Sequence, residues 1–395
     1  MNVRYISMVL ALLPAIACFA GVPLPKAVLS YTTPPDGRSH VILDVLSGSG
    51  QQAVAYVLLA SADLAAEPQQ ASGPTWDITV VPVTQKGAGE PLFVCKSGFL
   101  NPQQFQARLL SVDGRFAVLV KPKGGAWIVR ILNDHGRVER DVTLSNSMQR
   151  SPSFAVAVCS GRIAVIYGRS IDLVDVQQGI CETRRVGAKD AKSSMEVVCP
   201  SAAGGLLLAG STPVPGNAPL ATGTAVVAVD RGFGLIRSAA YPGVLPRAVV
   251  MTRPDMTSLV YLAGGAGNPL RMRVIDSELQ SRADEKVGDW NNILGSVTAV
   301  RVASTERTAV LYPQGLAGDK IVYCLDIRDD KARRVAQYDV PTNGIIAHVV
   351  AGSDDELLWI ALSTQEDALL YSPYSGQVIF LRGRQLQPEN NGGPK

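Results

Sequence analysis

The hydrophobic residues of this chain fall into short runs separated by polar turns. Runs such as FAVLV (116–120), IAVIY (163–167) and TAVLYP (308–313) are rich in Val, Ala, Leu and Ile. Unbroken apolar runs of this length are typical of strands that are buried on both faces. Helical periodicity is nearly absent, and only 61–70 has a pattern that allows a turn or two of helix. The pattern therefore predicts an all-β protein.

A turn unit repeats along the chain. Each copy places an apolar strand before a polar turn that often ends in Gly, and a second short strand follows. The copies are LVDVQQG (173–179), AVDRGFG (228–234), VIDSELQ (274–280), CLDIRDD (324–330) and LYSPYSG (370–376), with weaker ones at 131–136 and 81–87. The turns, near 84, 134, 176, 231, 277, 327 and 373, are separated by 42 to 55 residues. Such a period is a signature of propellers and solenoids.

Two further strand series keep the same period. In each repeat an innermost strand precedes a second apolar strand, and tight turns such as DGR (113–115) and SGR (160–162) join the two. Four antiparallel strands repeated seven times describe a seven-bladed β-propeller, an all-β fold of four-stranded antiparallel blades. A β-sandwich and a β-solenoid are the alternatives. No linker divides the repeats, so we expect one domain over 21–383 and a disordered tail over 384–395.

One strand-like run belongs to none of the seven sets. It is KAVLSYT (26–32), which precedes the first inner strand. A propeller is stable only when its first and last blades are joined, usually by a strand from one terminus. We therefore expect 26–32 to pair beside QVIFLR (377–382) in the last blade, either as the outer strand or as an extra fifth strand.

The turn unit resembles the repeat of quinoprotein-like and WD-like propellers, whose blades carry a strand, an Asp, a Gly and a second strand. The resemblance covers nearly the whole mature chain but is generic. Quinoprotein repeats end in a docking Trp, where this chain has Cys181, Ile236 and Phe380. The WD pair of this chain, Trp76-Asp77, begins a strand rather than ending one. The resemblance thus implies a propeller fold and no cofactor.

The start of the chain differs from the rest. A positive MNVR precedes an uncharged apolar stretch that ends with small residues at Cys18 and Ala20. This pattern predicts a signal peptide over 1–20 with cleavage after Ala20, and hence an exported protein, periplasmic or extracellular. Alternatively, AIAC resembles a bacterial lipobox, with Ala15 where that pattern has Leu, and Cys18 would then be lipidated. No later segment is apolar enough to span a membrane, so we expect no transmembrane segment in the mature chain.

The composition of the chain limits the classes of molecule that it can bind. Charged residues make up 18% of the 395, and the net charge is only +3 without a Lys/Arg block. We therefore expect no nucleic-acid partner. The five cysteines that remain after cleavage have neither the spacing of a disulfide framework nor that of a zinc site. Cys159 and Cys199 end the inner strands of adjacent repeats, where they either form a bridge or fill small apolar sites as free thiols.

Carboxylates offer few candidates for catalysis. Asp175, Asp230, Asp276 and Asp326 share one repeat position, which predicts that they cap the amides of a turn. Each copy faces a different direction around a ring, so they do not converge on one site. Asp172 is expected to face solvent rather than to form a catalytic pair with Asp175.

Histidine, on which many metal and acid–base sites depend, occurs only at 40, 135 and 348. We expect His40 and His348, on the inner strands of the first and last blades, to bond to backbone or water. The alternative is that they approach each other near the channel, beside Asp44. No phosphate-binding loop and no G-x-S-x-G motif occurs. We expect no metal and no cofactor, and these absences favour a protein that is not an enzyme.

Irregular segments are predicted to gather on one rim of the ring. Exposed aromatic, amide and Arg side chains on loops are typical of recognition surfaces. The candidates for such a binding rim are Phe99, Arg150, Trp290, Asn291 and Asn292. The alternative is that Phe99 and Trp290 fill gaps between blades.

We therefore expect an exported, non-catalytic, monomeric β-propeller that binds another protein, or an envelope or extracellular macromolecule, through this rim. One alternative is an enzyme or small-ligand binder whose residues come one from each blade around the central channel. Another is an envelope lipoprotein anchored at Cys18, similar to the propeller of outer-membrane assembly machinery, which has eight blades.

Overall fold

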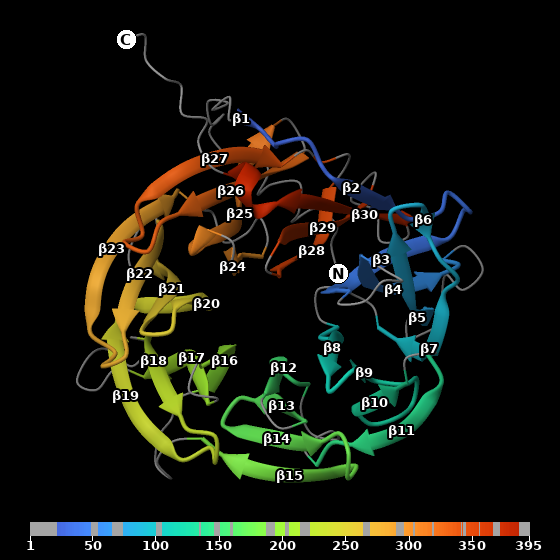
Figure 1. Cartoon of the computed structure of the whole chain (residues 1–395), viewed down its shortest axis with the longest axis horizontal. Coiled ribbons are helices and arrows are strands. Elements are labelled where there is room, and N and C mark those ends of the chain that lie inside the picture. The colour runs from blue at the N-terminus through green and yellow to red at the C-terminus, as the bar shows by residue number, and fades with distance from the viewer. Residues whose placement is uncertain are drawn as a thin grey trace, which may run out of the picture.

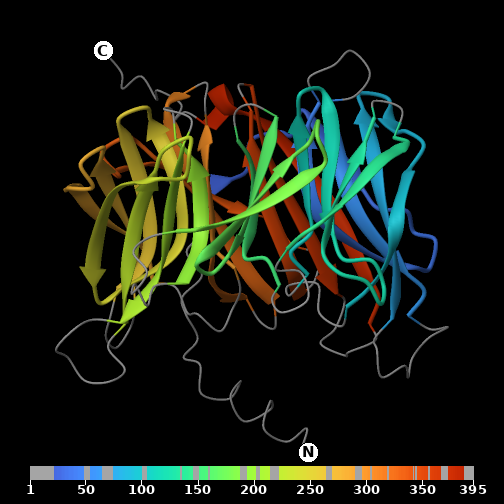
Figure 2. The same ribbon diagram turned by 90° about the horizontal axis from the view of Figure 1, so that it is seen from below.

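Seven sheets stand around a central axis in the computed structural model (Figure 1). Seen from the side, the sheets form a thick disc (Figure 2). The prediction of an all-β seven-bladed β-propeller is therefore confirmed. The residues that the structure describes are 22–48, 54–64, 74–99, 105–133, 136–145, 151–158, 161–186, 194–201, 205–213, 222–263, 269–289, 296–302, 305–317, 320–340, 342, 345–354, 356–365 and 372–386.

Blades 1 to 3 follow one another along the chain, each from an inner to an outer strand. Blade 1 contains β3 (Ser39–Ser47), β4 (Ala55–Ala62) and β5 (Thr75–Thr84), with β6 (Gly87–Ala88) and β7 (Leu92–Gly98) both paired to β5. Blade 2 contains β8 (Arg108–Val112), β9 (Arg115–Val120), β10 (Ile128–Leu132) and β11 (Val138–Thr143). Blade 3 contains β12 (Phe154–Val158), β13 (Arg162–Tyr167), β14 (Ser170–Asp175) and β15 (Ile180–Arg185).

Blades 4 to 7 complete the ring. Blade 4 contains β16 (Ser194–Pro200), β17 (Leu206–Pro213), β18 (Thr222–Val229) and β19 (Leu235–Pro242). Blade 5 contains β20 (Val244–Arg253), β21 (Met256–Ala263), β22 (Leu270–Asp276) and β23 (Ser281–Gly288). Blade 6 contains β24 (Thr298–Val302), β25 (Arg307–Ala317), β26 (Lys320–Arg328) and β27 (Arg334–Val340). Blade 7 contains β28 (Ile345–Ser353), β29 (Leu357–Gln365) and β30 (Tyr374–Arg382), with β2 (Leu29–Thr32) outermost.

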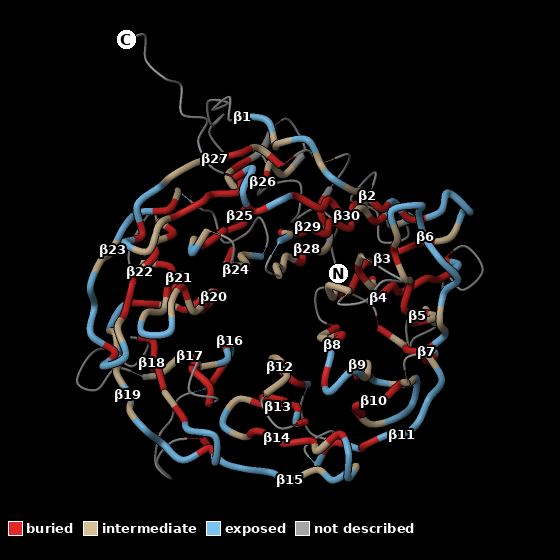
Figure 3. The backbone as a smooth tube through the Cα atoms, in the orientation of Figure 1, coloured by how far each residue is buried: buried red, intermediate tan, exposed pale blue. Residues whose placement is uncertain are grey.

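The hydrophobic core lies between neighbouring blades. Strand β4 shows why, because successive side chains point to opposite faces of a sheet. Val57 and Leu59 pack toward blade 7, whereas Leu58 and Ala60 pack toward blade 2. The outer strands β11, β15, β19 and β23 are largely exposed, and buried residues concentrate further in (Figure 3). Burial on both faces explains the unbroken apolar runs of the second strands.

Aspartates cap the predicted turns of blades 3, 4 and 5. The Asp230 Oδ1 accepts hydrogen bonds of 2.8 Å from the amides two and four residues later. Asp276 makes the same pair of bonds at 2.9 and 2.8 Å, and Asp175 accepts one of 2.7 Å from the Gln178 amide. These carboxylates are turn-capping devices, as predicted.

Two predicted turn positions are wrong. In blade 6, Asp326 lies inside β26 and is 0% exposed, and Asp329 caps the turn instead, through the amides of Lys331 and Arg333 at 3.0 and 2.8 Å. The strand continues because the side chains that follow Asp326 are also buried. In blade 7, the turn near 373 precedes the third strand rather than following it, because the outer strand of that blade comes from the other end of the chain.

The N-terminal arm, which we define as residues 22–36, closes the ring. Strand β2 pairs antiparallel with β30, with Leu29 opposite Phe380. This confirms the predicted pairing and makes β2 the outer fourth strand. Before it, β1 (Val22–Pro23) pairs in parallel with β27 of blade 6, a contact that was not predicted. The arm therefore runs from blade 6 along blade 7 to blade 1 (Figure 1).

The C-terminal end is ordered beyond the predicted domain boundary at 383. The 3₁₀ helix η3 (Gly383–Leu386) places Leu386 at 1% exposure in the core cluster of blades 6 and 7. Burial of this large apolar side chain holds the first residues of the predicted tail, and 387–395 lie outside the described residues. Within the described ranges, no helix has the length and apolar character needed to cross a membrane.

Candidate functional site

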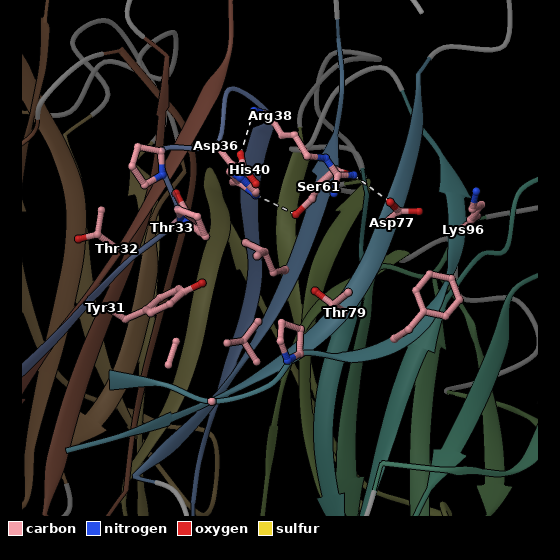
Figure 4. Close-up of a pocket in the computed structure, with 18 residues that line it drawn as sticks. Tyr31, Thr32, Thr33, Asp36, Arg38, His40, Ser61, Asp77, Thr79 and Lys96 are labelled. Atoms are coloured by element: carbon pink, nitrogen blue, oxygen red, sulfur yellow. Dashed lines mark hydrogen bonds and ion pairs between the residues drawn. The ribbon is translucent and has the colours of Figure 1, made fainter. Parts of the chain in front are cut away.

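A cavity of about 830 Å³ lies at the seam where blade 7 meets blade 1 (Figure 4). Residues 31–36 of the N-terminal arm form one side. Strands β4, β5 and β7 of blade 1 form the other, with Leu59, Thr79 and Phe93 among the lining residues. We call this cavity the seam pocket. It exists because the same arm that closes the ring also covers the outer part of blade 1.

The register of blade 1 arranges the floor of the pocket. Across β4 and β5, Leu59 pairs with Thr79 and Ser61 pairs with Asp77. Phe93 of β7 pairs with Thr79. Residues directly opposite each other in a sheet share a face, and here that face turns toward blade 7. The floor therefore changes from Leu59, Thr79 and Phe93 to the more polar Ser61, Asp77 and Lys96 further along the strands.

A chain of hydrogen bonds closes the polar end of the pocket. His40 is 4% exposed, with Nδ1 2.8 Å from Ser61 Oγ and Nε2 2.8 Å from Asp36 Oδ1. Burial by itself raises the pKa of Asp36, but hydrogen bonds from His40 and the Arg38 amide outweigh it and hold that pKa below its usual range. In the neutral ring, Nε2–H donates to Asp36 and Nδ1 accepts from the Ser61 hydroxyl.

These three residue types also make up the Ser–His–Asp nucleophile of hydrolases, but the geometry differs. In that triad the serine bonds to Nε2 and the aspartate to Nδ1; here the two partners are exchanged. His40 and Ser61 are already opposite each other in the β3–β4 ladder, and Asp36 is supplied by the N-terminal arm. The chain of bonds therefore ties the arm to blade 1, and we assign these residues a positioning role.

Arg38 adds a second tie at the same end. Its Nη2 donates to Asp77 Oδ2 at 2.8 Å and to the Ser61 carbonyl at 3.2 Å. The Arg38 and Asp77 side chains are 39% and 33% exposed, and an ion pair of this kind contributes only about 0.2–1 kcal/mol to stability. Its clearer effect is to fix two charged groups at the edge of the cavity. Lys96, which pairs with Asp77 across β5 and β7, is exposed beside them.

Among the predicted rim residues, Phe99 is the one that lies within the described residues. Phe99 is 9% exposed and stacks between Trp76 and Phe105, with ring centroids 4.8 and 4.3 Å away. It therefore takes the packing role that was its alternative, because the edge of blade 1 leaves a gap that an aromatic ring fills. The remaining rim candidates, Arg150, Trp290, Asn291 and Asn292, lie outside the described residues.

The two inner-strand histidines have separate partners. His40 belongs to the seam pocket, whereas His348 bonds to the backbone of Leu43. Burial and the nearby Arg108 guanidinium lower the pKa of His348 to about 4, so its ring is neutral at physiological pH.

Asp44 accepts hydrogen bonds of 2.9 Å from two backbone amides. Among the described residues, no group of three or more His, Cys, Asp or Glu could hold a metal ion.

Two other expectations concern Asp172 and the pair Cys159 and Cys199. Asp172 is wrong as a solvent-facing residue, because it is 0% exposed in the middle of blade 3 and accepts a hydrogen bond of 2.6 Å from Thr183 Oγ1. Cys199 is a buried free thiol, and burial raises its pKa to about 12. Its predicted neighbour Cys159 lies outside the described residues.

The seam pocket itself was not predicted, because its polar residues are spread over four strands and the arm. The sequence does show alternation along β4 and β5. This alternation places Ser61 on the same face of β4 as Leu59, and Asp77 on the same face of β5 as Thr79. That signal needs the register of the strands, which the sequence patterns did not supply. His40 was expected to bond to backbone or water, whereas its ring bonds to the side chains of Ser61 and Asp36.

Comparisons with known proteins give no family. No protein-family model and no curated protein sequence matches the chain. Among solved structures, the calcium-binding protein regucalcin from Agrobacterium tumefaciens str. C58 is similar over 71% of this chain and 92% of its own. The TM-score is 0.43 and the sequence identity is 14%. A similarity this low carries no argument about function.

Proposed function

We propose that this protein is an exported, non-catalytic binding propeller that takes up a small ligand in the seam pocket. The observation that carries the proposal is the cavity of about 830 Å³ at the ring-closing seam, with polar groups fixed at one end. Ligand sites are typically concave and mostly apolar, about 300–1,000 Å³ in volume, with a few placed polar groups. The seam pocket has this size and this composition.

The seam pocket replaces the loop rim as the proposed binding surface. Phe99, the rim candidate whose position is described, is buried in an aromatic stack. The pocket residues, in contrast, are held in place from both sides, by the ladder of blade 1 and by the bonds from Asp36 and Arg38. Such preorganisation lowers the entropy cost of binding.

Export is part of the proposal and rests on the pattern of residues 1–20. Cleavage after Ala20 would leave Gly21 directly before β1, which starts at Val22. Mass spectrometry of the mature N-terminus tests this. We expect a chain that begins at Gly21, whereas a lipidated Cys18 would support an envelope lipoprotein instead.

A fragment screen with a blocked pocket tests the binding proposal. Compounds that raise the unfolding temperature of the parent protein should lose this effect with Thr79→Trp, which fills the cavity from β5. Ile180→Trp is the matched control, because Ile180 is 50% exposed on the distant strand β15. Hits that disappear only in Thr79→Trp support the proposal. Hits that survive in Thr79→Trp, or a screen without hits, contradict it.

A further inference from the structure

The carboxylates at the polar end keep unused hydrogen-bonding capacity. Asp36 uses Oδ1 for His40 and the Arg38 amide, and Asp77 uses Oδ2 for Arg38. Within the described chain, the second oxygen of each carboxylate makes no hydrogen bond. The Asp36 and Asp77 side chains are 43% and 33% exposed, so a ligand can reach both. Each free oxygen can accept a hydrogen bond from a hydroxyl group.

Neutral hydroxyls continue this polar surface into the cavity. Tyr31 from β2 and Thr79 from β5 face each other across the pocket, and the hydroxyl of Tyr31 points toward the side of Thr79 (Figure 4). A tyrosine or threonine hydroxyl both donates and accepts. Burial raises the pKa of Tyr31, which keeps its proton in place as a donor. The pocket therefore offers acceptors at one end and donor–acceptor groups further in.

An exposed aromatic ring lies on the same face. Phe93 lines the pocket opposite Thr79 in the β5–β7 ladder and is 55% exposed. Covering an exposed apolar ring with an apolar ligand surface is favourable. Leu59 and Val81, which are themselves largely buried, line the floor beside it. A flat apolar face on the ligand would cover both the ring and the floor.

The charges of the pocket balance. Two carboxylates, Asp36 and Asp77, are matched by Arg38 and Lys96, while the His40 ring already bonds at both nitrogens. The lining thus has no excess of one charge that would favour a strongly charged ligand. A neutral ligand with many hydroxyls needs no such excess. The surface thus fits a molecule that is apolar on one face, hydroxylated around its edge and uncharged.

We propose, building on the proposed function of the seam pocket, that its ligand is a neutral carbohydrate of one or two sugar rings. A sugar ring presents an apolar C–H face, which can lie on Phe93, and an edge of hydroxyls, which can donate to Asp36 and Asp77. The cavity of about 830 Å³ lies within the range for small-molecule sites. No covalent step is involved, and the sugar is bound and released unchanged.

Saturation-transfer NMR and titration calorimetry with named sugars test the proposal on the full mature chain. The probes are glucose, N-acetylglucosamine, maltose and cellobiose, with glucuronic acid and glucosamine as charged comparators. At least one neutral sugar should bind, and more tightly than its charged comparator. Phe93→Ala and Asp77→Asn should each weaken that binding about tenfold. Ile236→Ala, a 56% exposed residue on β19, is the matched control and should leave binding unchanged.

The outcomes separate this inference from the proposed function. If no neutral sugar binds while other fragments still bind in a Thr79→Trp-sensitive way, the carbohydrate proposal is wrong and the seam pocket remains a ligand site. If sugars bind equally well to Phe93→Ala and to the parent, the ligand does not stack on this ring and the inference fails. If nothing binds in a Thr79→Trp-sensitive way, both proposals fail together.

Discussion

Thr33 and Gly376 exchange two hydrogen bonds across 343 positions of the sequence. The Gly376 amide donates to Thr33 Oγ1 at 3.0 Å, and the Thr33 amide donates to the Gly376 carbonyl at 2.9 Å. A Cβ on Gly376 would lie only 2.8 Å from Ile42 Cδ1 of blade 1. The arm, the last blade and the first blade thus meet at one point beside the seam pocket.

We predict that Gly376→Ala destabilises the protein by about 1–3 kcal/mol, because the added methyl group overpacks a buried contact. Urea unfolding measures the change. Gly125→Ala is the control, since its Cβ would meet its nearest atom at an ordinary 3.4 Å. Equal stability of both variants would show that blade 1 does not press against Gly376.

Deletion of residues 22–33 should lower the unfolding temperature and promote aggregation. The deletion removes β1 and β2 and exposes the backbone edge of β30, a ready template for pairing with another chain. Differential scanning calorimetry and light scattering measure both effects. Removal of 387–395 is the control and keeps the buried Leu386. If the N-terminal deletion unfolds like the parent, packing between blades closes the ring without the arm.

Asp326→Asn should cost much more stability than Asp329→Ala. Asp326 is buried between Arg328 and Arg334, with Nη2 of Arg328 2.7 Å away. Loss of its charge leaves the 3% exposed Arg328 side chain without its counter-ion, and breaking a buried pair costs about 3–5 kcal/mol. Asp329 caps an exposed turn, where we expect about 1 kcal/mol. Chemical denaturation of both variants shows which one loses more stability. A larger loss for Asp329→Ala would contradict the assignment of Asp326 to a buried ion pair rather than to the turn.

Acid should weaken the fold partly through Asp284. Burial by itself raises the pKa of Asp284, but hydrogen bonds from Tyr261, Arg273 and Arg271 outweigh it and hold the pKa below its usual range. A lowered folded-state pKa contributes stability that is present above the unfolded pKa, about 3.9 for Asp, and is lost as the pH falls through the folded value.

Asp284→Asn should therefore be less stable than the parent at pH 7, by about 1–3 kcal/mol. The difference should shrink at pH 3, where protonation begins to remove the same charge from the parent. Urea unfolding at the two pH values measures it. A difference that stays constant with pH would mean that the charge of Asp284 is not what stabilises this cluster.

The blades could be predicted because their burial is periodic. Second strands such as β9 and β13 are buried on both faces, so their composition alone marks them, whereas inner strands such as β12 are only partly buried. The exact positions of the turns were harder to predict than the strands. The segment CLDIRDD contains Asp326, Asp329 and Asp330, and composition does not tell which aspartate ends the strand. Burial of Ile327 and Arg328 decides it, and that depends on the neighbouring blade.

The seam pocket could not be predicted for a different reason. Its groups come from positions as far apart as Asp36 and Lys96, and they meet only when the β3–β4–β5–β7 register is fixed. Sequence alternation shows that Ser61 follows Leu59 on one face, but not that Asp77 lies opposite. The pairing of 26–32 with the last blade was predicted, whereas the cavity that forms beneath the arm depends on side-chain volumes.

Crystals soaked with the sugars and fragments that bind in solution test the central claim most directly, because they show where a ligand sits. We expect its density in the seam pocket, between Tyr31 of the arm and Thr79 of blade 1, with Phe93 covered. Density confined to the central channel or to the loop rim, with the seam pocket empty at full ligand occupancy, would contradict the account.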